Sequence, residues 1–497
     1  MPEKYSLYKA KMQQLADISH AASVLNWDQE VYMPSKGAQF RAQQLSTLAG
    51  LHHQFFASDE LGEILNELNQ DDSLTFEQKR NVQLTLKDYT DNKKYTTEFV
   101  QKMSKTVSEA FIAWQEAKQK ADFTIFAPKL KELVKLKREE CEILGYTNHP
   151  YDALLDQYEP GITVAELDEI FEGVKEQLVP FVKEIFAAPQ NDESVMFQHY
   201  DKDKQWQFSL DLLKDMGYDF DAGRQDISTH PFTTSFSPQD VRVTTRVNEN
   251  DLSEIIWSTI HEGGHALYEQ GLLPEYYGLP QGSACSLGIH ESQSRLWENN
   301  VGRSLAYWQY QFEKLKKYFP EQLKNYTEED FYKAMNIVKP SLIRTNADEV
   351  TYHFHILIRY EIEKELIAGN FEVDELPALW NKKYRDYLGI DVPSDDKGVL
   401  QDIHWSHGSF GYFPTYSIGS FYAAQFFQQA NKEIEGLENM IQKGDTSKLL
   451  EWLREKIHKH GRIFEANQLC EKVTGEKLNF SYFMDYAQKK YRSLYNL

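Results

Sequence analysis

Two histidines and an adjacent glutamate form the segment of this chain best suited to chemistry. His261, Glu262 and His265 stand in the run His261-Glu262-Gly263-Gly264-His265. Residues four positions apart on a helix lie on one face, one turn apart, so both imidazoles can share a tetrahedral zinc ion. Glu262 projects beside them and can reach a water molecule at the metal rather than the metal itself. This spacing predicts a hydrolytic metal site.

The pattern is specific for its length. With 15 histidines and 76 acidic residues among 497, chance gives at most about 0.07 such matches in the chain. The alternative interpretation is an amphipathic helix whose two histidines are only hydrogen-bonded. Asp251 can cap this helix, with Glu254 three residues later as in a capping box. Gly263 and Gly264 each cost about 1 kcal/mol relative to alanine, and we expect them to admit the backbone of a neighbouring element.

A catalytic zinc needs a third protein ligand and one open position. The candidates follow the second histidine: Glu269, His290, Glu291 and Glu298. Glu269 lies on the same helix as the histidines, at a spacing that reaches the metal only awkwardly. Residues 290–298 are expected to form a second helix after a glycine-rich loop. Spacing alone favours Glu291 over Glu298 by roughly two to one, because a helix-surface glutamate is usually solvated.

Composition places the chain among folded, acidic proteins. Its 54 lysines and arginines against 76 acidic residues give a net charge of −22, while hydrophobic residues make up 41% and aromatic residues 13%. The core is therefore ample, and the charge excludes a nucleic-acid partner, which requires a basic surface. No apolar stretch approaches the roughly 18 residues of a membrane span, and the charged N-terminus does not resemble a signal peptide. Three distant cysteines indicate neither disulfides nor a cysteine zinc site, so we expect a cytoplasmic protein.

Helical periodicity dominates the chain. Apolar residues recur at three- and four-residue intervals, as at Leu45, Leu48, Leu51 and Phe55 and again from Phe99 to Trp114, and predict helices with a buried face. The segment 241–247 alternates valine with polar residues and predicts a strand. Chain breaks are expected near 71–73, 189–192 and 273–288. The fold class that follows is mainly α-helical, with a small sheet near the middle of the chain.

The metal-binding helix is one of six motifs that occur in a fixed order. The other five are His230-Pro231-Phe232, Asp240-Val241-Arg242-Val243-Thr244, His290-Glu291-Ser292-Gln293, Ile343-Arg344-Thr345-Asn346-Ala347-Asp348 and Gly398-Val399-Leu400-Gln401-Asp402-Ile403-His404-Trp405. Together, and at every motif position, they resemble the carboxypeptidase Taq family, the zinc metallocarboxypeptidases also called thermostable carboxypeptidase 1. The motifs cover residues 230–405, whereas the N-terminal half shows only general similarity.

This resemblance implies His261, His265 and Glu291 as metal ligands and Glu262 as the catalytic base, which decides between Glu291 and Glu298. It implies one Zn²⁺ per chain, which Co²⁺ or Mn²⁺ could replace. It also implies a large helical zincin fold similar to neurolysin and angiotensin-converting enzyme, with a small β-sheet beside a deep substrate groove, and a homodimer. The chain would form one metallocarboxypeptidase domain, 1–497, in which an N-terminal helical region of about residues 1–190 covers the groove and residues 191–497 form the catalytic core.

The activity implied is release of C-terminal amino acids from peptides with broad specificity. Such an enzyme must recognise a free α-carboxylate, which a planar guanidinium can pair bidentately. Arg344 is the first candidate for this role and Arg242 the second. The alternative for Arg344 is an ion pair with Asp348, four residues on. Further substrate-binding residues are expected within the motifs: His230, Asp240 and Gln401.

The oxyanion that develops at the scissile carbonyl needs preorganised hydrogen-bond donors. The segment 404–416 supplies several, and in the similar neurolysin-like enzymes a histidine and a tyrosine twelve positions on have this role. His404 and Tyr416 show that spacing, with His407 and Tyr412 as further candidates. Each of the four can equally be a packed, hydrogen-bonded side chain. The strand 241–247 could hold an extended substrate by β-augmentation.

Two other functions are compatible with the metal motif. An oligopeptidase of the same fold would cut peptides internally and would accept amidated peptides as well as free acids. A non-catalytic helical protein would close a structural zinc site with four protein ligands, which leaves Glu262 without a role. In a catalytic site, Asp348 and Asp402 are candidate hydrogen-bond partners of the ligand imidazoles.

Overall fold

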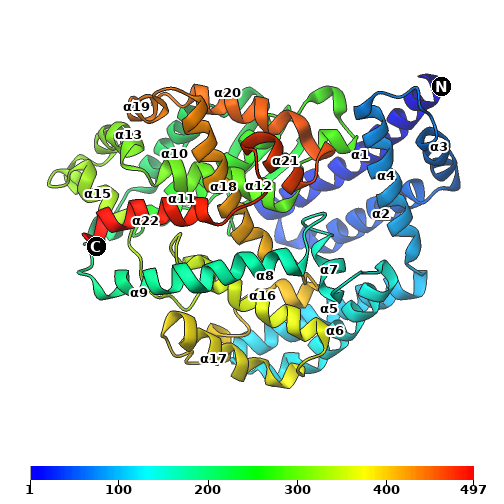
Figure 1. Ribbon diagram of the computed structural model, residues 1–497, viewed down its shortest axis with the longest axis horizontal. Helices are drawn as coiled ribbons and strands as arrows, with labels where there is room; N and C mark the ends of the chain where they lie inside the picture. Colours follow the sequence, from blue (N-terminus) through cyan, green and yellow to red (C-terminus); the bar gives the residue numbers. More distant parts are fainter. Residues whose placement is uncertain (1) are drawn as a thin grey trace. The chain divides into compact units, whose positions relative to one another are not determined.

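The computed structural model describes residues 2–497 and consists mainly of helices, with one small sheet (Figure 1). The helices are α1 (Pro2–Val31), α2 (Ala38–Phe56), α3 (Asp59–Asn69), α4 (Phe76–Lys94), α5 (Thr97–Lys120), α6 (Phe123–Leu144), α7 (Pro150–Leu155), α8 (Val164–Gly173), α9 (Val179–Ala187), α10 (Lys202–Met216), α11 (Leu252–Glu269), α12 (Leu287–Arg295), α13 (Leu305–Tyr318), α14 (Pro320–Leu323), α15 (Glu328–Met335), α16 (Tyr352–Ala368), α17 (Leu376–Leu388), α18 (Pro414–Glu433), α19 (Leu437–Gln442), α20 (Ser447–Lys456), α21 (Ala466–Thr474) and α22 (Ser481–Tyr495). The strands are β1 (Gly223–Ile227), β2 (Thr233–Ser237) and β3 (Asp240–Thr245). The expected fold class is therefore confirmed, and none of the helices described is long and apolar enough to cross a membrane.

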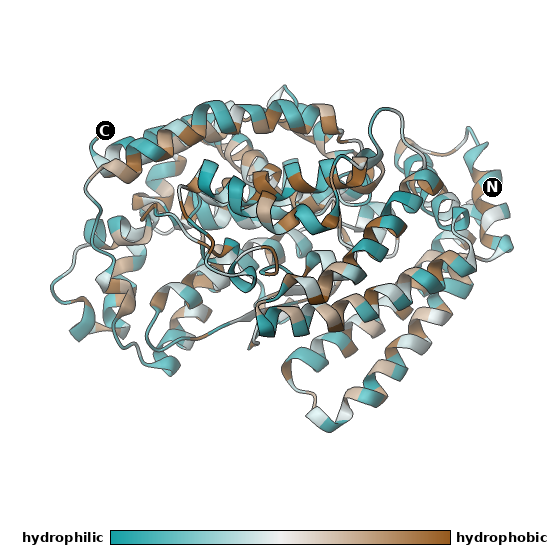
Figure 2. Cartoon of the chain, turned by 90° about the horizontal axis from the view of Figure 1, so that it is seen from below, coloured by the Kyte–Doolittle hydropathy of each residue, from teal (hydrophilic) through white to brown (hydrophobic). Residues whose placement is uncertain are grey.

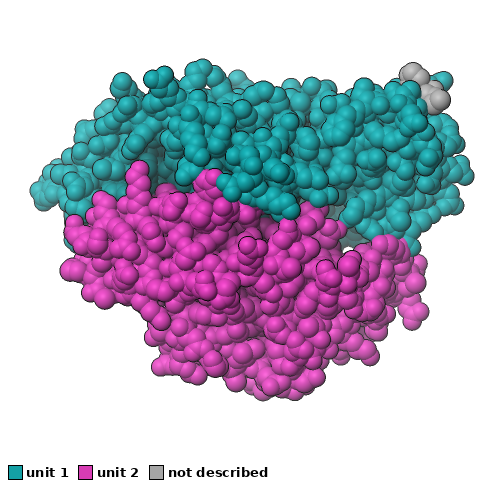
Figure 3. Space-filling model, viewed as in Figure 1, with its two compact units in different colours: residues 1–93, 192–335, 423–477 teal, residues 94–191, 336–422, 478–497 magenta. Residues whose placement is uncertain are grey.

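The chain divides into two compact units, each assembled from three separate stretches (Figure 3). Unit 1 comprises residues 1–93, 192–335 and 423–477, and unit 2 comprises residues 94–191, 336–422 and 478–497. The sheet and the helices α11 and α12 belong to unit 1, whereas α16 and the segment 404–413 belong to unit 2. The four motifs between residues 230 and 293 therefore lie in unit 1, whereas the motifs at residues 343–348 and 398–405 lie in unit 2.

The sheet of unit 1 has the strand order β1-β3-β2. The central strand, β3, pairs in parallel with β1 and antiparallel with β2, and a register shift at Ser235/Ser237 interrupts the second pairing. The predicted strand is present as β3, but both of its edges are occupied, so the expectation that a peptide pairs with it is wrong. Only the edge strands β1 and β2 have a side open to such pairing by topology. Both edge strands escaped prediction because their short, polar sequences lack an alternating pattern.

Most helices carry hydrophobic and hydrophilic residues on different faces (Figure 2). In α5, Phe99, Ala110 and Trp114 are buried, as their spacing predicts. Helix α2 differs, because none of its residues is buried and Leu51 and Phe55 are exposed. The periodic apolar residues of α2 therefore identify a helix correctly but do not belong to the core.

Helix α11 begins where the sequence places its cap. The Asp251 side chain accepts a hydrogen bond from the backbone N–H of Ser253 at 2.9 Å. The capping box is absent, because the Glu254 carboxylate pairs with the guanidinium of Arg246 at the end of the sheet instead. One carboxylate at the helix start is enough to satisfy a free N–H group and to complement the helix dipole.

The two glycines of α11 lie against different neighbours. A Cβ atom on Gly264 would stand 2.6 Å from the Ser294 Cα and 2.7 Å from the Gln293 carbonyl oxygen, both in the backbone of α12. The atoms nearest to a Cβ on Gly263 would be the side-chain ends of Leu213 and Met216 in α10. The expected close backbone approach therefore exists at Gly264, and it brings α12 against the histidine-bearing face of α11.

Alanine substitutions at the two glycines should have different effects. Gly264→Ala forces the α11 and α12 backbones apart, and we expect the free energy of unfolding to fall by about 1–3 kcal/mol, despite a gain of about 1 kcal/mol in helix propensity. Gly263→Ala meets flexible side chains and should be close to neutral. Urea denaturation of both variants tests this, and a larger loss in Gly263→Ala would contradict it.

Candidate metal centre

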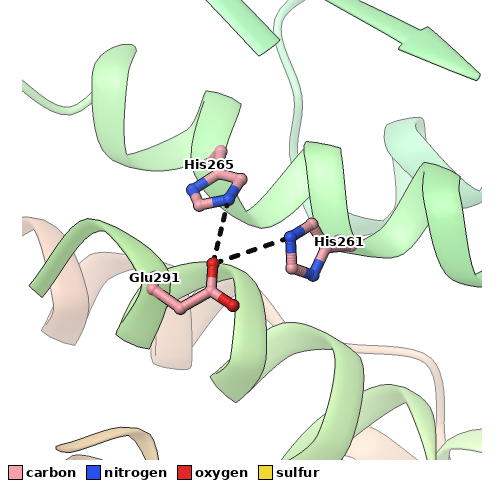
Figure 4. A group of neighbouring side chains, drawn as sticks. All are labelled: His261, His265 and Glu291. Atoms are coloured by element: carbon pink, nitrogen blue, oxygen red, sulfur yellow. Dashed lines mark ion pairs between the residues drawn. The ribbon is translucent and has the colours of Figure 1, made fainter. Parts of the chain in front are cut away.

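The side chains of His261, His265 and Glu291 converge between α11 and α12 (Figure 4). The Nε2 atoms of His261 and His265 lie 3.7 Å and 3.4 Å from the same Glu291 oxygen, Oε2. Ligand atoms at about 2.0–2.2 Å from a tetrahedral zinc ion are separated by about 3.3–3.6 Å. The two separations from Glu291 Oε2 lie close to this range, and the three donor atoms, all within 4.8 Å of one another, could bind one divalent ion of this size.

Glu298, the alternative third ligand, lies behind the ring of His261. Its Oε2 is 2.9 Å from His261 Nδ1, the nitrogen that faces away from the cluster. Glu298 belongs to a π-helical segment, Leu296–Gly302, that continues α12. A carboxylate in this position fixes the ring orientation and directs Nε2 at the metal. Glu298 thus has the role for which Asp348 and Asp402 were candidates on sequence grounds.

Glu291 is buried, the two histidines are partly buried, and the guanidinium of Arg295 balances the charge of Glu291. Burial alone would raise the pKa of Glu291, but the guanidinium of Arg295 and the imidazole of His261 hold it well below its usual range. Burial, reinforced by His290, lowers the pKa of His265 to about 3. His265 is therefore neutral at physiological pH and Glu291 is ionised, which are the protonation states that a metal requires of its ligands.

Glu262 lies next to the ligands and faces the sheet. Its Oε2 is 2.7 Å from the Thr233 hydroxyl, which also lies 2.9 Å from the Glu262 carbonyl oxygen. Burial raises the pKa of the Glu262 carboxyl above its ordinary value. Thr233 is at the start of β2, a strand that the sequence pattern does not predict, and no motif indicates its contact with Glu262. A fixed carboxylate with a raised pKa is suited to accept and return a proton.

The remaining ligand candidates pair with each other. His290 Nε2 is 2.8 Å from Glu269 Oε1, and the His290 ring stacks on His265 with the ring centroids 4.5 Å apart. Thr233 and Glu269 also line a cleft of about 490 Å³ whose other walls come from α1, His52 of α2, β2 and the segment 272–284. A ligand in this cleft would therefore lie beside the metal cluster, within unit 1.

Two of the expected substrate-binding residues form an ion pair on β3. Arg242 Nε and Asp240 Oδ1 are 2.8 Å apart, and the guanidinium lies over the Trp27 ring at 4.4 Å. His230 is exposed on the connection before β2. These three residues belong to the same unit as the metal cluster.

Arg344 is buried in unit 2 and forms an ion pair with Asp402, not with Asp348 as in the alternative interpretation of its role. Its Nε and Nη2 lie 3.0 Å and 2.9 Å from Asp402 Oδ1, and Nη1 donates to the Tyr352 hydroxyl. Gln401 accepts from the Arg344 backbone N–H. The Asp348 carboxylate accepts hydrogen bonds from the backbone N–H groups of the following turn. Gln401 and Asp402, in the motif at residues 398–405, thus position Arg344.

The candidates for oxyanion stabilisation are partly grouped. His404 Nε2 is 3.3 Å from the Tyr416 hydroxyl, and the rings of His404 and Tyr412 are 5.3 Å apart. Burial lowers the pKa of His404 to about 3, so its ring is neutral. His407 packs against Phe111 with the ring centroids 5.3 Å apart. Three of the four candidates therefore form one cluster in unit 2.

A buried glutamate, Glu363, which no sequence motif indicated, holds the segment 404–412 in place. Glu363 of α16 accepts hydrogen bonds from Trp405 Nε1 at 2.7 Å, the Gly411 N–H at 2.9 Å and the Tyr151 hydroxyl at 2.5 Å. Trp405 follows His404 and Gly411 precedes Tyr412, so the carboxylate fixes both sides of the segment. Its partners lie far apart in the sequence, and no local pattern could have revealed them.

A histidine pair one turn apart, a carboxylate from the neighbouring helix and a buried glutamate define a metallopeptidase-type centre in a mainly helical protein. The profile of the family described as carboxypeptidase Taq (M32) metallopeptidase matches residues 7–491. The chain therefore belongs to the carboxypeptidase Taq (M32) family of metallopeptidases, as its motifs predict, and family membership implies a divalent metal.

Individual relatives agree with this assignment. The chain is 40% identical to carboxypeptidase 1 of Bacillus subtilis, with 98% of this chain and 97% of that protein covered. It is 41% identical to thermostable carboxypeptidase 1 of Thermus thermophilus, with 97% and 96% covered. The crystal structure of an M32 carboxypeptidase from Deinococcus radiodurans R1, 38% identical, matches with a TM-score of 0.98 over 100% of both chains.

The contact between Glu298 and His261 predicts an effect on metal affinity. Glu298→Gln keeps the shape of the side chain but removes its charge, and we expect the affinity for Zn²⁺ to fall about 10- to 100-fold. Competition with a chromophoric chelator measures this. Glu254→Gln is the matched control, because this partly exposed carboxylate of α11 pairs with Arg246 and not with a metal ligand. Equal affinities in Glu298→Gln and the unchanged protein would contradict the assigned role.

The burial of Glu363 predicts a pH dependence of stability. Burial raises the pKa of this carboxyl to about 7 from 4.5, so the folded protein holds the proton more tightly than the unfolded chain. The contribution of protonated Glu363 to the free energy of unfolding is complete below pH 4.5, the pKa of this carboxyl in the unfolded chain. It is lost as the pH rises through the pKa of about 7 in the folded protein.

Glu363→Gln cannot ionise, so its free energy of unfolding should fall less than that of the unchanged protein between about pH 5 and pH 8. The difference in slope should reach at most about 1.4 kcal/mol per pH unit. Urea denaturation at several pH values gives both slopes. Parallel slopes would show that Glu363 is already ionised at the lower pH.

Proposed function

We propose that this protein is a zinc-dependent metallocarboxypeptidase that releases C-terminal amino acids from peptides with broad specificity. The observation that supports this most strongly is the cluster of His261, His265 and Glu291 with the buried Glu262 beside it, in a chain of the carboxypeptidase Taq family. A zinc ion held by the three ligands would polarise the scissile carbonyl and acidify a water molecule. Co²⁺ or Mn²⁺ could replace it in a site of nitrogen and oxygen donors.

Glu262 is the proposed general base. Its carboxylate accepts a proton from the water that attacks the scissile carbonyl, and then delivers that proton to the nitrogen of the leaving group. The contact with Thr233 at 2.7 Å holds the carboxylate in one orientation, and burial raises its pKa toward the working pH. We infer that β2, an edge strand that begins at Thr233, pairs with the extended peptide and places its scissile bond beside Glu262.

The remaining roles concern the substrate. For the peptide α-carboxylate we propose Arg344 first and Arg242 second, because a guanidinium can bind a carboxylate through two hydrogen bonds. Asp402 already orients the Arg344 guanidinium. For the oxyanion we propose His404 and Tyr416, followed by Tyr412 and His407. Three further residues of the motifs are proposed to contact the peptide: His230, Asp240 and Gln401.

We further propose that the whole chain, 1–497, acts as one catalytic domain, with an N-terminal helical region (residues 1–190) and a core (residues 191–497), and that it forms a homodimer in the cytoplasm. All three cysteines are buried thiols, which suits a reducing compartment. The dimer follows from the family resemblance. Sedimentation velocity of the purified protein tests it, with a species of twice the chain mass expected.

A substitution at Glu262 separates catalysis from metal binding. Glu262→Gln should lower kcat by about 10²- to 10⁴-fold, because a proton acceptor is lost, while one zinc ion per chain remains bound. Peptide hydrolysis measured by mass spectrometry and zinc measured by elemental analysis give the two results. A Glu262→Gln variant that retains full activity would exclude this mechanism.

The type of peptide distinguishes a carboxypeptidase from an oligopeptidase. A free-acid peptide should lose its C-terminal residues in sequence, whereas the matching C-terminal amide should be stable, because it lacks the carboxylate that an arginine recognises. Arg344→Ala should reduce kcat/KM for the free acid selectively. Internal cleavage of both peptides at equal rates would favour an endopeptidase.

A further inference from the structure

The Glu291 carboxylate is held on the side opposite to the histidines. Arg295 follows Glu291 by one helical turn, and its Nε lies 2.7 Å from Glu291 Oε1. The other oxygen, Oε2, faces the imidazoles and also accepts from the Ser294 hydroxyl at 3.1 Å. One carboxylate oxygen is therefore bound to a guanidinium while the other faces the metal position.

Arg295 also contacts the carboxylate behind His261. Its Nη1 is 3.1 Å from Glu298 Oε2, the same atom that lies 2.9 Å from His261 Nδ1. One planar guanidinium thus connects a metal ligand with the partner of another metal ligand. Charged hydrogen bonds of this geometry are strong and directional. Loss of Arg295 would release both carboxylates at the same time.

We propose that Arg295 restricts Glu291 to a single metal-binding oxygen and thereby selects a four-coordinate ion at this centre. This inference depends on the ligand set of the proposed function. An unrestrained carboxylate can bind through both oxygens, which raises the coordination number and suits larger ions that accept more ligands. With Oε1 held by Arg295, the protein supplies three donor atoms, and one position stays open for water and substrate.

Arg303 provides a matched comparison. It is another partly buried arginine near Glu298, with Nη2 3.2 Å from Glu298 Oε1 and Nη1 2.7 Å from the Met335 carbonyl oxygen. Its guanidinium lies 3.9 Å from the Trp257 ring centroid. Its contact with Glu298 is at Oε1, whereas Arg295 contacts Oε1 of Glu291 and Oε2 of Glu298. Removing Arg303 changes the local charge equally, so the comparison separates charge from the restraint on Glu291.

The test uses the full chain with Co²⁺ bound in place of the native ion. Four-coordinate Co²⁺ absorbs visible light far more strongly than six-coordinate Co²⁺. We expect a strong spectrum for the unchanged protein and for Arg303→Gln, and a clearly weaker one for Arg295→Gln. In competition with a chelator, Arg295→Gln should reduce the preference for Zn²⁺ over Mn²⁺ about 10- to 100-fold, with no such change in Arg303→Gln.

Arg295→Lys keeps the charge but lacks the planar nitrogen that holds Oε1, so it should shift the spectrum and the metal preference as Arg295→Gln does. This variant is informative even if the neutral substitution prevents folding. If both Arg295 variants match Arg303→Gln in spectrum and in metal preference, the inference is wrong. If the unchanged protein binds no Co²⁺ at His261 and His265, the proposed metal centre itself fails, which is a different result.

Discussion

The close approach of two helix backbones at Gly264 is the constraint on which the metal centre depends. With no side chain at this position, the backbone of α12 at Gln293 and Ser294 comes into contact with α11. This contact brings Glu291 to within 3.4–3.7 Å of the two histidine Nε2 atoms. A larger residue would separate donor atoms whose spacing must match the radius of one ion. Packing between the two helices therefore sets the distance between the histidines and Glu291.

A second requirement is the balance of buried charge. Glu262, Glu291 and Glu298 are three buried carboxylates in a small volume, and such a group is costly unless opposite charges lie nearby. Arg295 and Arg303 supply two positive charges in direct contact with Glu291 and Glu298. A bound divalent cation would complete the balance. Glu262 accepts a hydrogen bond from the Thr233 hydroxyl, and burial raises the pKa of its carboxyl beside the ionised Glu291.

Local spacing predicted the site residues that lie close together on one helix or in one motif. His261 and His265 share a face because they are four residues apart. Glu291 and Glu298 are seven residues apart and face the same way, so spacing could not show that one contacts Nε2 atoms and the other Nδ1. Thr233, Arg295 and Glu363 gain their roles from contacts across elements, which a single sequence does not reveal. The same reasoning mistook α2 for a core helix, because periodicity reports a helix face and not what covers it.

The proposed catalysis requires one divalent ion bound by His261, His265 and Glu291. The most direct measurement is an X-ray crystal structure of the purified protein with anomalous data collected on both sides of the zinc absorption edge. We expect one strong anomalous peak per chain, bound to the two Nε2 atoms and to Oε2 of Glu291. A structure of the zinc-saturated protein with no peak at these three atoms, or with a fourth protein ligand in the open position, would contradict the proposed centre.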